Sequence, residues 1–237
     1  MNLSLLAMLA AAAGNIVWVG HFAGSGAPPA PWRVVQLKRT IPPTHYRLTS
    51  IDGVPAVEAV AHSSMALLVR PVAVDLARTP ILCWKWRIEA PVAAADMTKR
   101  SGDDYAARIY VAFDMPTSAL SLGTRLKLAL ARNIYGEAVP DAAINYVWDN
   151  KHPIGTWQKS AYTDRAQLIV KESGNGRERQ WVAERADIAA DFARAFGGRP
   201  GVPVEVAVAT DTDNTKSQAQ AAFADLRFVP RLADCPA

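Results

Sequence analysis

Short runs of alternating apolar and polar residues follow one another along this chain, and they constrain its fold more than any other feature. Such period-two alternation predicts strands that bury one face. Turn-forming residues separate the runs, and Asp52 with Gly53 is typical of a tight hairpin. The runs are WRVVQL, HYRLTSIDGVPAVEAVA, SMALLVRPVAVDL, PILCWKWRIEA, DYAARIYVAFD, AINYVWD, AQLIVKES, QWVAERADI, VPVEVAVATD and FADLRFV. This succession of short strands predicts an antiparallel sandwich or barrel.

Two segments break the alternation and predict short helices at the edge of the sheets. Residues 118–134 and 187–196 repeat apolar residues every four positions, which aligns them on one helical face. These residues are Leu122, Leu126, Leu130 and Ile134 in the first segment, and Ile188, Phe192 and Phe196 in the second. Asp187 is placed to cap the second helix, and a pair of glycines follows its end.

The size and charge of the chain indicate a globular protein. Its 237 residues, half of them apolar, suffice for one sizeable domain, expected over residues 31–230 with a tail at 231–237. The 26 basic and 22 acidic residues are mixed along the sequence, without a basic cluster or a nucleic-acid motif. The net charge of +4 therefore indicates solubility, and nucleic acid is not an expected partner.

The N-terminal segment predicts export. The first 32 residues contain no Lys, Arg, Asp or Glu. Residues 1–27 join an apolar run to a small-residue site ending at Ala27, which is typical of a secretory signal peptide. An uncleaved anchor is the alternative, because the apolar run is long enough to span a bilayer. We therefore expect a periplasmic or secreted protein that meets a membrane only through this segment.

The chain has two cysteines, Cys83 and Cys235. In an oxidising compartment they could pair and fasten the C-terminal tail to the domain. Alternatively, Cys83 is a small core residue and Cys235 is a free thiol. The four histidines lack the spacing of metal ligands, so no zinc site is expected.

The segment KRSGDDYAARIYVAFD contains the first candidate binding residues. Its alternation buries the face of Ile109, which places Arg108 and Tyr110 on the opposite face. Asp103 and Asp104 lie at the entrance of this strand. Adjacent carboxylates can share a cation, and a nearby arginine would keep them ionised. An ordinary turn is the alternative explanation of the two aspartates.

Further candidates are aromatic. Tyr146 and Trp148 share one face of the run AINYVWD and are interleaved with an amide. Carbohydrate sites combine aromatic rings with hydrogen-bonding groups, so both residues are candidate glycan contacts, although strands in a sandwich core have the same pattern. Trp84 and Trp86 also share a strand face, and we expect them to fill the core rather than to form a stacking platform.

The stretch TDTDNT, residues 210–215, gathers three further candidates at the end of a strand. It begins like a calcium-binding loop, but the glycine and the bidentate glutamate of an EF-hand are absent, so that motif is excluded. Asp211, Asp213 and Asn214 stay candidate ligands of a calcium ion, and capping of their own backbone in a turn is the alternative. Asp211 could also converge with Arg108 from a neighbouring strand.

Several motifs, in their order and spacing, resemble an uncharacterised bacterial family of exported proteins known as a domain of unknown function, number three-zero-four-seven. The motifs are CWKWRI, GDDYAARIYVAF, INYVWDN, VKESG, ADIAADFARAFG and VAVATDTDNTKSQAQAAFADLRF. The resemblance implies a mainly β, antiparallel β-sandwich of jelly-roll type with one or two short peripheral helices, similar in outline to carbohydrate-binding modules and some polysaccharide lyases. It implies no established activity. The matching positions are Trp84, Trp86, Asp103, Asp104, Arg108, Tyr110, Tyr146, Trp148, Asp211, Asp213 and Asn214.

Together these features favour a non-catalytic glycan-binding protein, with a polysaccharide or another envelope glycan as its partner. A polysaccharide hydrolase or lyase is one alternative, and a structural protein of the cell envelope is another. No hydrolase motif is recognisable, so no catalytic residue is assigned. The expected ligand-binding residues are Asp103, Asp104, Arg108, Tyr110, Tyr146, Trp148 and Asp211.

Overall fold

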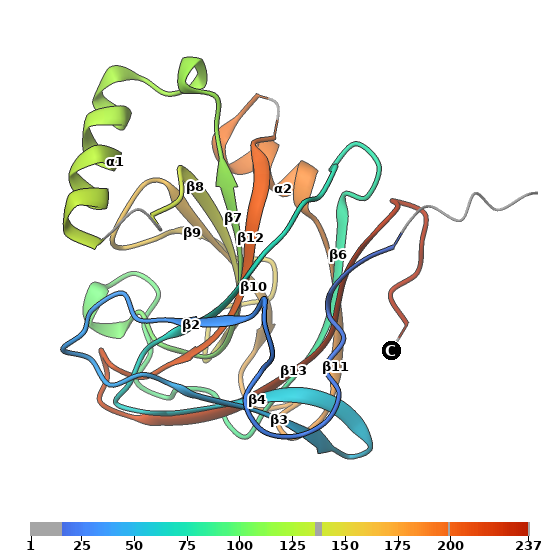
Figure 1. The fold of residues 1–237 in the computed structure, drawn as a ribbon. Coiled ribbons are helices and arrows are strands. Elements are labelled where there is room, and N and C mark those ends of the chain that lie inside the picture. The colour runs from blue at the N-terminus through green and yellow to red at the C-terminus, as the bar shows by residue number, and fades with distance from the viewer. Residues whose placement is uncertain (1–15, 136–138, 199, 237) are drawn as a thin grey trace, which may run out of the picture.

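The computed structural model describes residues 16–135, 139–198 and 200–236, and it consists of two packed β-sheets (Figure 1). The six-stranded sheet has the order β11-β6-β13-β4-β3, with β1 paired to β13. Its strands are β1 (Val17–Gly20), β3 (His45–Ile51), β4 (Val54–His62), β6 (Ile81–Ile88), β11 (Val182–Asp187) and β13 (Gln218–Val229). The hairpin β3–β4 turns at Asp52 and Gly53, both with positive φ, as the sequence predicts.

The seven-stranded sheet has the order β2-β5-β12-β7-β8-β10-β9. Its strands are β2 (Arg33–Val35), β5 (Leu67–Pro71), β7 (Tyr105–Asp114), β8 (Ala142–Asp149), β9 (Trp157–Lys159), β10 (Ala166–Ser173) and β12 (Val202–Asp211). Neighbouring strands are antiparallel except β8 and β10, which are parallel. This exception arises because the chain leaves β8, forms β9 at the outer edge, and returns as β10 between the two. The expected jelly-roll β-sandwich is confirmed, with one mixed sheet.

Aromatic side chains fill the space between the sheets. The rings of Trp84 and Tyr146 lie 5.3 Å apart, and those of Trp86 and Trp148 lie 5.8 Å apart. All four side chains are at most 1% exposed. Edge and tilted contacts of this kind stabilise a core beyond the area that they bury. The prediction that Trp84 and Trp86 belong to the core is therefore confirmed.

Two α-helices lie at the periphery of the described chain, α1 (Leu122–Tyr135) and α2 (Ile188–Phe196). Helix α2 agrees with its prediction: the Asp187 side chain accepts a hydrogen bond from the backbone of Ala190, and Phe192 is buried. Short 3₁₀ turns occur at Arg100–Gly102 and Thr117–Ala119.

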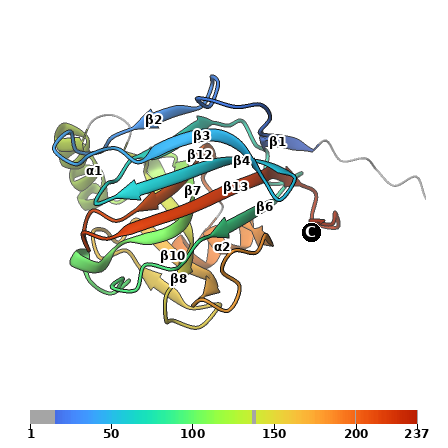
Figure 2. The same ribbon diagram turned by 90° about the horizontal axis from the view of Figure 1, so that it is seen from below.

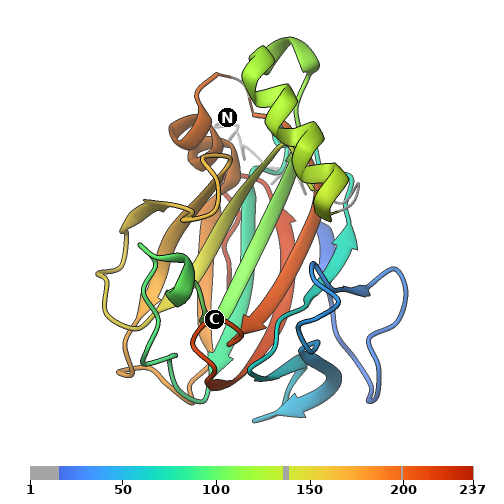
Figure 3. The same ribbon diagram turned by 90° about the vertical axis from the view of Figure 1, so that its left-hand side faces the viewer.

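The sequence predicts that the leucines spaced four apart in α1 pack against the sheets, and this prediction is wrong for Leu122 and Leu126. Leu122 and Leu126 are 81% and 74% exposed, whereas Leu128 is buried. The helix stands outside the seven-stranded sheet, so most of its surface faces away from the core (Figures 1 and 3). The side chains of Leu130 and Ile134 lie outside the described part of the chain.

The structure adds residues before position 31 to the folded domain. Strand β1 pairs with β13, and Val19 and Phe22 are buried in the core. Residues 1–15, which form most of the predicted leader, lie outside the described residues. Within the described ranges, no helix has the length and apolar character needed to cross a membrane.

A disulfide bond joins Cys83 on β6 to Cys235, and their Cα atoms are 5.5 Å apart. The C-terminal tail therefore folds back against the six-stranded sheet (Figure 2). Of the two alternatives that the sequence left open, the paired one is present.

We predict that Cys235→Ser lowers the free energy of unfolding by about 2–5 kcal/mol, because the bond closes a long loop and restricts the unfolded chain. Denaturant titration measures this change. A reductant should lower the stability of the wild-type protein to that of the variant and leave the variant unchanged. Equal stability of the two oxidised proteins would contradict the prediction.

Candidate functional site

The outer face of the seven-stranded sheet carries the candidate residues of β7. Ile109 and Val111 point into the core, so Arg108 and Tyr110 lie on the face turned away from the other sheet. Figure 3 shows β7 and β12 from this side, in green and orange, with the six-stranded sheet behind them. Asp211, the last residue of β12, is paired in register with Tyr105. The predicted face of Arg108 and Tyr110 is thus confirmed.

Arg108 and Asp211 form a buried ion pair. The distance from Arg108 Nη1 to Asp211 Oδ2 is 2.7 Å, and the Tyr105 backbone N–H donates to Asp211 Oδ1 at 3.1 Å. The residues Arg108 and Asp211 are 4% and 2% exposed. The guanidinium carbon also lies 4.6 Å from the centre of the Tyr105 ring and 4.9 Å from that of Tyr110. This arrangement compensates the positive charge of Arg108 by a carboxylate and by two π faces, although its Nε donates no hydrogen bond.

The surroundings of the pair are acidic. Asp103 Oδ2 lies 3.6 Å from Arg108 Nη1. Burial, together with the nearby Asp104 and Asp103, raises the pKa of Asp211 to about 8 against the lowering effect of Arg108. Burial by itself lowers the pKa of Arg108. The nearby Asp211, Tyr110, Asp103 and Tyr105 raise it by more, so the pKa lies well above its ordinary value. The arginine therefore stays charged and holds the acidic groups together.

Asp104 organises the loop that contains TDTDNT. Its Oδ2 accepts hydrogen bonds from the backbone N–H of Thr215 at 2.6 Å and from the Thr215 hydroxyl at 2.7 Å. Its Oδ1 accepts from the backbone and the side-chain amide of Asn214, both at 3.2 Å. Asp104 lies at the entrance of the neighbouring strand, and its side chain holds this loop in place. The alternative in which the loop residues cap their own backbone is therefore not the main source of its order.

The accessible part of the cluster is smaller than the sequence predicted. Tyr110, Asp213 and Asn214 are partly exposed, whereas Asp103 and Asp104 are buried. Tyr162, which is 46% exposed, donates its hydroxyl to Asn214 Oδ1 at 3.0 Å. Sequence reasoning missed Tyr162, because it lies in a turn-rich loop without periodicity.

Two predicted contact residues do not belong to this face. Tyr146 and Trp148 are 0% and 1% exposed and point into the core against Trp84 and Trp86. They cannot stack on a ligand at the surface, so their assignment as glycan contacts is corrected. The strand alternation places Asn145, between them, on the outer face opposite Tyr110.

Several buried side-chain atoms around the Arg108–Asp211 pair form no hydrogen bond. Among the described residues, Asp103 Oδ1, the Tyr105 hydroxyl, Arg108 Nε and Asn145 Oδ1 have no hydrogen-bond partner. Buried polar atoms in folded proteins are nearly always paired with protein, water or ligand. These atoms are themselves inaccessible to solvent, so the polar groups that a molecule at the surface can reach are those of Tyr110, Tyr162, Asp213 and Asn214.

Three carboxylates lie close enough to share a cation. One oxygen each from Asp104, Asp211 and Asp213 lies within 4.8 Å of the others. Carboxylate oxygens suit calcium, which was expected on Asp211, Asp213 and Asn214. Asp104, which was not among the expected calcium ligands, joins Asp211 and Asp213 in this group, and the Asn214 amide oxygen accepts a hydrogen bond from Tyr162. Both oxygens of Asp104 already accept hydrogen bonds, so a cation would share them with protein donors.

The comparisons with known proteins identify a family but no activity. A family model described as "Protein of unknown function (DUF3047)" matches residues 30–227. No curated protein matches the chain. Solved structures also match at low identity, and the TM-scores of the three given below mean that they bear on neither the site nor its function.

The first of these structures is the family 30 carbohydrate-binding module of the cellulosomal cellulase Cel9D-Cel44B of Clostridium thermocellum, with a TM-score of 0.39, 10% identity, and coverage of 92% of this chain and 95% of that one. The second is the xyloglucanase domain of NopAA, a type three effector from Sinorhizobium fredii, in complex with cellobiose, with a TM-score of 0.39, 9% identity, and coverage of 86% and 100%. The third is endoglucanase 3 of Trichoderma harzianum, from family GH12, with a TM-score of 0.38, 6% identity, and coverage of 85% and 98%.

We predict that Arg108→Met lowers the free energy of unfolding by about 3–5 kcal/mol at pH above about 8, because Asp211, whose pKa Arg108 lowers, must then stay protonated or carry a buried charge without its partner. The loss of unfolding free energy in this variant should be smaller at low pH, where Asp211 is protonated and needs no cationic partner. With its raised pKa, Asp211 contributes most to stability below its unfolded pKa of about 4. That contribution falls as the pH rises towards about 8, since the folded state binds the proton more tightly.

Denaturant titrations across this pH range test the ion pair, with Asp211→Asn as the control. That variant should remove the pH-dependent part of the loss, and combining it with Arg108→Met should recover part of the stability. An Arg108→Met protein as stable as the wild type throughout the range would contradict the prediction.

Calcium binding by Asp104, Asp211 and Asp213 stays a prediction. Calcium that binds only the folded state raises the melting temperature by mass action, and a chelator reverses the effect. Asp213→Asn should abolish the calcium-induced shift, whereas Asp164→Asn, which alters an exposed acid elsewhere, should retain it. A melting temperature independent of calcium would end this hypothesis.

Proposed function

The chain belongs to the DUF3047 family, whose function is unknown, and we propose that it is an exported, non-catalytic glycan-binding protein. One observation carries the proposal: a buried ion pair, Arg108 with Asp211, supports partly exposed tyrosine, acid and amide groups on one sheet face. The accessible groups are Tyr110, Tyr162, Asp213 and Asn214.

The chemistry of these groups matches that of a sugar. Each sugar hydroxyl needs a donor or an acceptor, which Asn214 and Asp213 can supply, and the apolar face of a sugar ring packs on an aromatic ring. Tyr162, which is 46% exposed, offers such a ring, with Arg100 over one of its faces, whereas Tyr110 is only partly exposed and carries Arg108 over its ring. The network beneath them is buried and is held by the contact of Arg108 with Asp211 and by the hydrogen bonds of Asp104 to the loop, which lowers the ordering cost of the binding step.

The positions of the acidic residues support binding over hydrolysis. Hydrolysis needs two carboxyl groups that reach the substrate, one as acid and one as base or nucleophile. Asp103, Asp104 and Asp211 are at most 6% exposed and are engaged with Arg108, with loop atoms or with strand backbone. Asp213 alone of this group is partly exposed.

One feature of the structure supports export. The Cys83–Cys235 disulfide is of a kind that persists in oxidising compartments. The packing of Val19 and Phe22 also bears on processing, because cleavage after Ala27 would remove strand β1 and two core side chains. We therefore place the end of any cleaved leader before Val17, in a segment outside the described residues.

A glycan array tests the binding function directly. We expect the wild-type protein to retain at least one glycan, and Asp213→Asn and Tyr162→Ala to weaken that interaction about tenfold, equivalent to about 1.4 kcal/mol. Asp164→Asn, an exposed acid close to Tyr162 in sequence, is the matched control and should bind as the wild type does.

A product assay on each retained glycan separates binding from catalysis. We expect neither new reducing ends nor unsaturated products. Turnover that is lost in Asp213→Asn would favour the enzyme alternative, and no retained glycan on a broad array would remove the main support for the proposal.

A further inference from the structure

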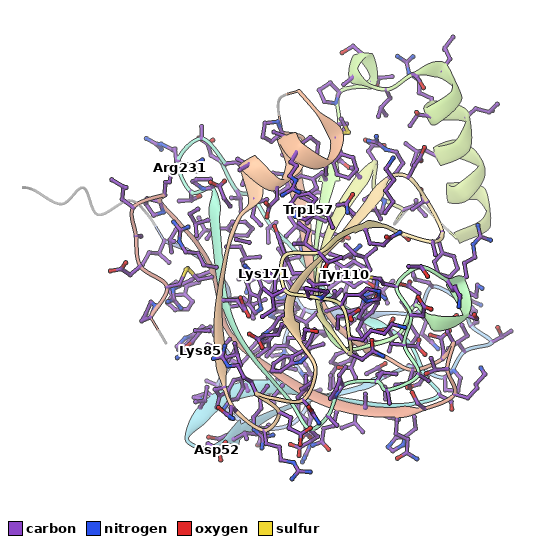
Figure 4. All side chains as sticks on the ribbon, turned by 180° about the vertical axis from the view of Figure 1, so that it is seen from behind. Asp52, Lys85, Tyr110, Trp157, Lys171 and Arg231 are labelled. Atoms are coloured by element: carbon purple, nitrogen blue, oxygen red, sulfur yellow. A yellow bond between two sulfur atoms is a disulfide. The ribbon has the colours of Figure 1, made fainter. Side chains whose placement is uncertain are left out.

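A second feature of the fold lies at the open edge between the two sheets, away from Arg108. A groove of about 220 Å³ separates β10 of one sheet from β11 of the other, beneath α2. Its main lining residues are Trp157, Ile169, Lys171, Arg185, Asp191 and Arg194. Figure 4 labels Trp157 and Lys171, which come from the adjacent strands β9 and β10. The volume lies below the roughly 300–1,000 Å³ of pockets for drug-sized ligands, so one small ring fits it better than a longer molecule.

One wall of the groove is apolar and well anchored. Trp157 packs against the main core while part of its ring stays accessible, and Ile169 is buried beside it. The Arg194 guanidinium lies 4.0 Å from the centre of the Trp157 ring, which orients both side chains. Ile154, which is 61% exposed, extends this wall at the rim.

The opposite wall provides a fixed acceptor. Asp191 on α2 is partly buried, and its Oδ2 accepts a hydrogen bond from the Tyr146 hydroxyl at 2.7 Å. Tyr146 reaches Asp191 from the core, where its ring packs on Trp84. The core tyrosine thus positions the carboxylate at the groove, and the second oxygen of Asp191 can accept from a hydroxyl group.

The charge of the groove favours an anion. Three cationic side chains line it, Lys171, Arg185 and Arg194, against the two carboxylates of Asp187 and Asp191. Asp187 is already neutralised, because it accepts from Arg231 and caps α2. Lys171 donates to the backbone oxygen of Arg185 at 2.7 Å and its Nζ lies 3.6 Å from Glu184 Oε2, so its charge is partly compensated and Arg194 is the main cation of the groove. A ligand in the groove therefore meets a net positive surface beside an aromatic ring.

From this combination we propose that the groove binds one acidic sugar residue, a pyranose ring that carries a carboxylate. The sugar ring packs against Ile154 and the part of the Trp157 ring that Arg194 leaves accessible, its carboxylate pairs with Arg194 beside Lys171, and a hydroxyl donates to Asp191. The groove shares no residue with the Arg108 face, so this site stands independently of the proposed function described above.

NMR titration of the wild-type protein with D-glucuronate and D-galacturonate tests the proposal. We expect saturable binding of at least one of them, with neutral D-glucose bound at least about fivefold more weakly because it lacks the charge. Arg194→Gln and Lys171→Gln should each weaken uronate binding about fivefold or more. Arg78→Gln, which alters an exposed arginine outside the groove, should stay within about twofold of the wild type.

The outcomes of this titration distinguish binding in the edge groove from binding at the Arg108 face. Retention of uronate binding in Asp213→Asn, together with its loss in Arg194→Gln, supports the groove, whatever the glycan array gives. The reverse pattern assigns the uronate to the Arg108 face and overturns the proposal. Absence of uronate binding also overturns it, as does inorganic phosphate binding as tightly as the uronates, since the groove would then recognise charge alone.

Discussion

The packing of β6 against β8 across the sandwich determines most of what this protein presents to solvent. Trp84 and Trp86 face Tyr146 and Trp148, and these large rings set the direction of every other residue on the two strands. Because alternation leaves no choice once one face is buried, Asn145 of β8 must lie on the outer face. The register between β7 and β8 then places Tyr110 opposite Asn145. The core thus positions the polar face without contributing to it.

A sheet face that buries Arg108 and Asp211 has a cost that the fold must offset. Both charges leave water, and their mutual attraction compensates only because further partners satisfy them: two tyrosine rings for the cation and a backbone N–H for the anion. Asp104 extends this order to the loop after β12 through Thr215 and Asn214. The partly exposed groups above are consequently held by a network rather than by isolated side chains.

Tyr146 illustrates how one residue serves two parts of the molecule. Its ring belongs to the core, which is why it cannot be a surface contact of the Arg108 face. Its hydroxyl still reaches Asp191 at the edge groove. A buried tyrosine needs a partner for its hydroxyl, and here that partner is the carboxylate that lines the groove.

The period of the sequence by itself predicted most of the strands and the face of Arg108, because alternation is a local property of the backbone, but it missed β1, which was assigned to the leader, and the short β9. It also determined helix α2, through the Asp187 cap. Local pattern failed for Tyr146 and Trp148, since an aromatic strand face looks the same whether it meets a core or a ligand. It could not identify Tyr162, whose role depends on a loop reaching Asn214.

Only the tertiary structure decided which distant residues meet. Arg108 and Asp211 are 103 positions apart, and the pairing of β7 with β12 brings them into contact. Cys83 and Cys235 are 152 positions apart, and sequence alone left their pairing open. Contacts of this separation depend on strand order and register, which are set by the packing of the whole sandwich rather than by any segment of it.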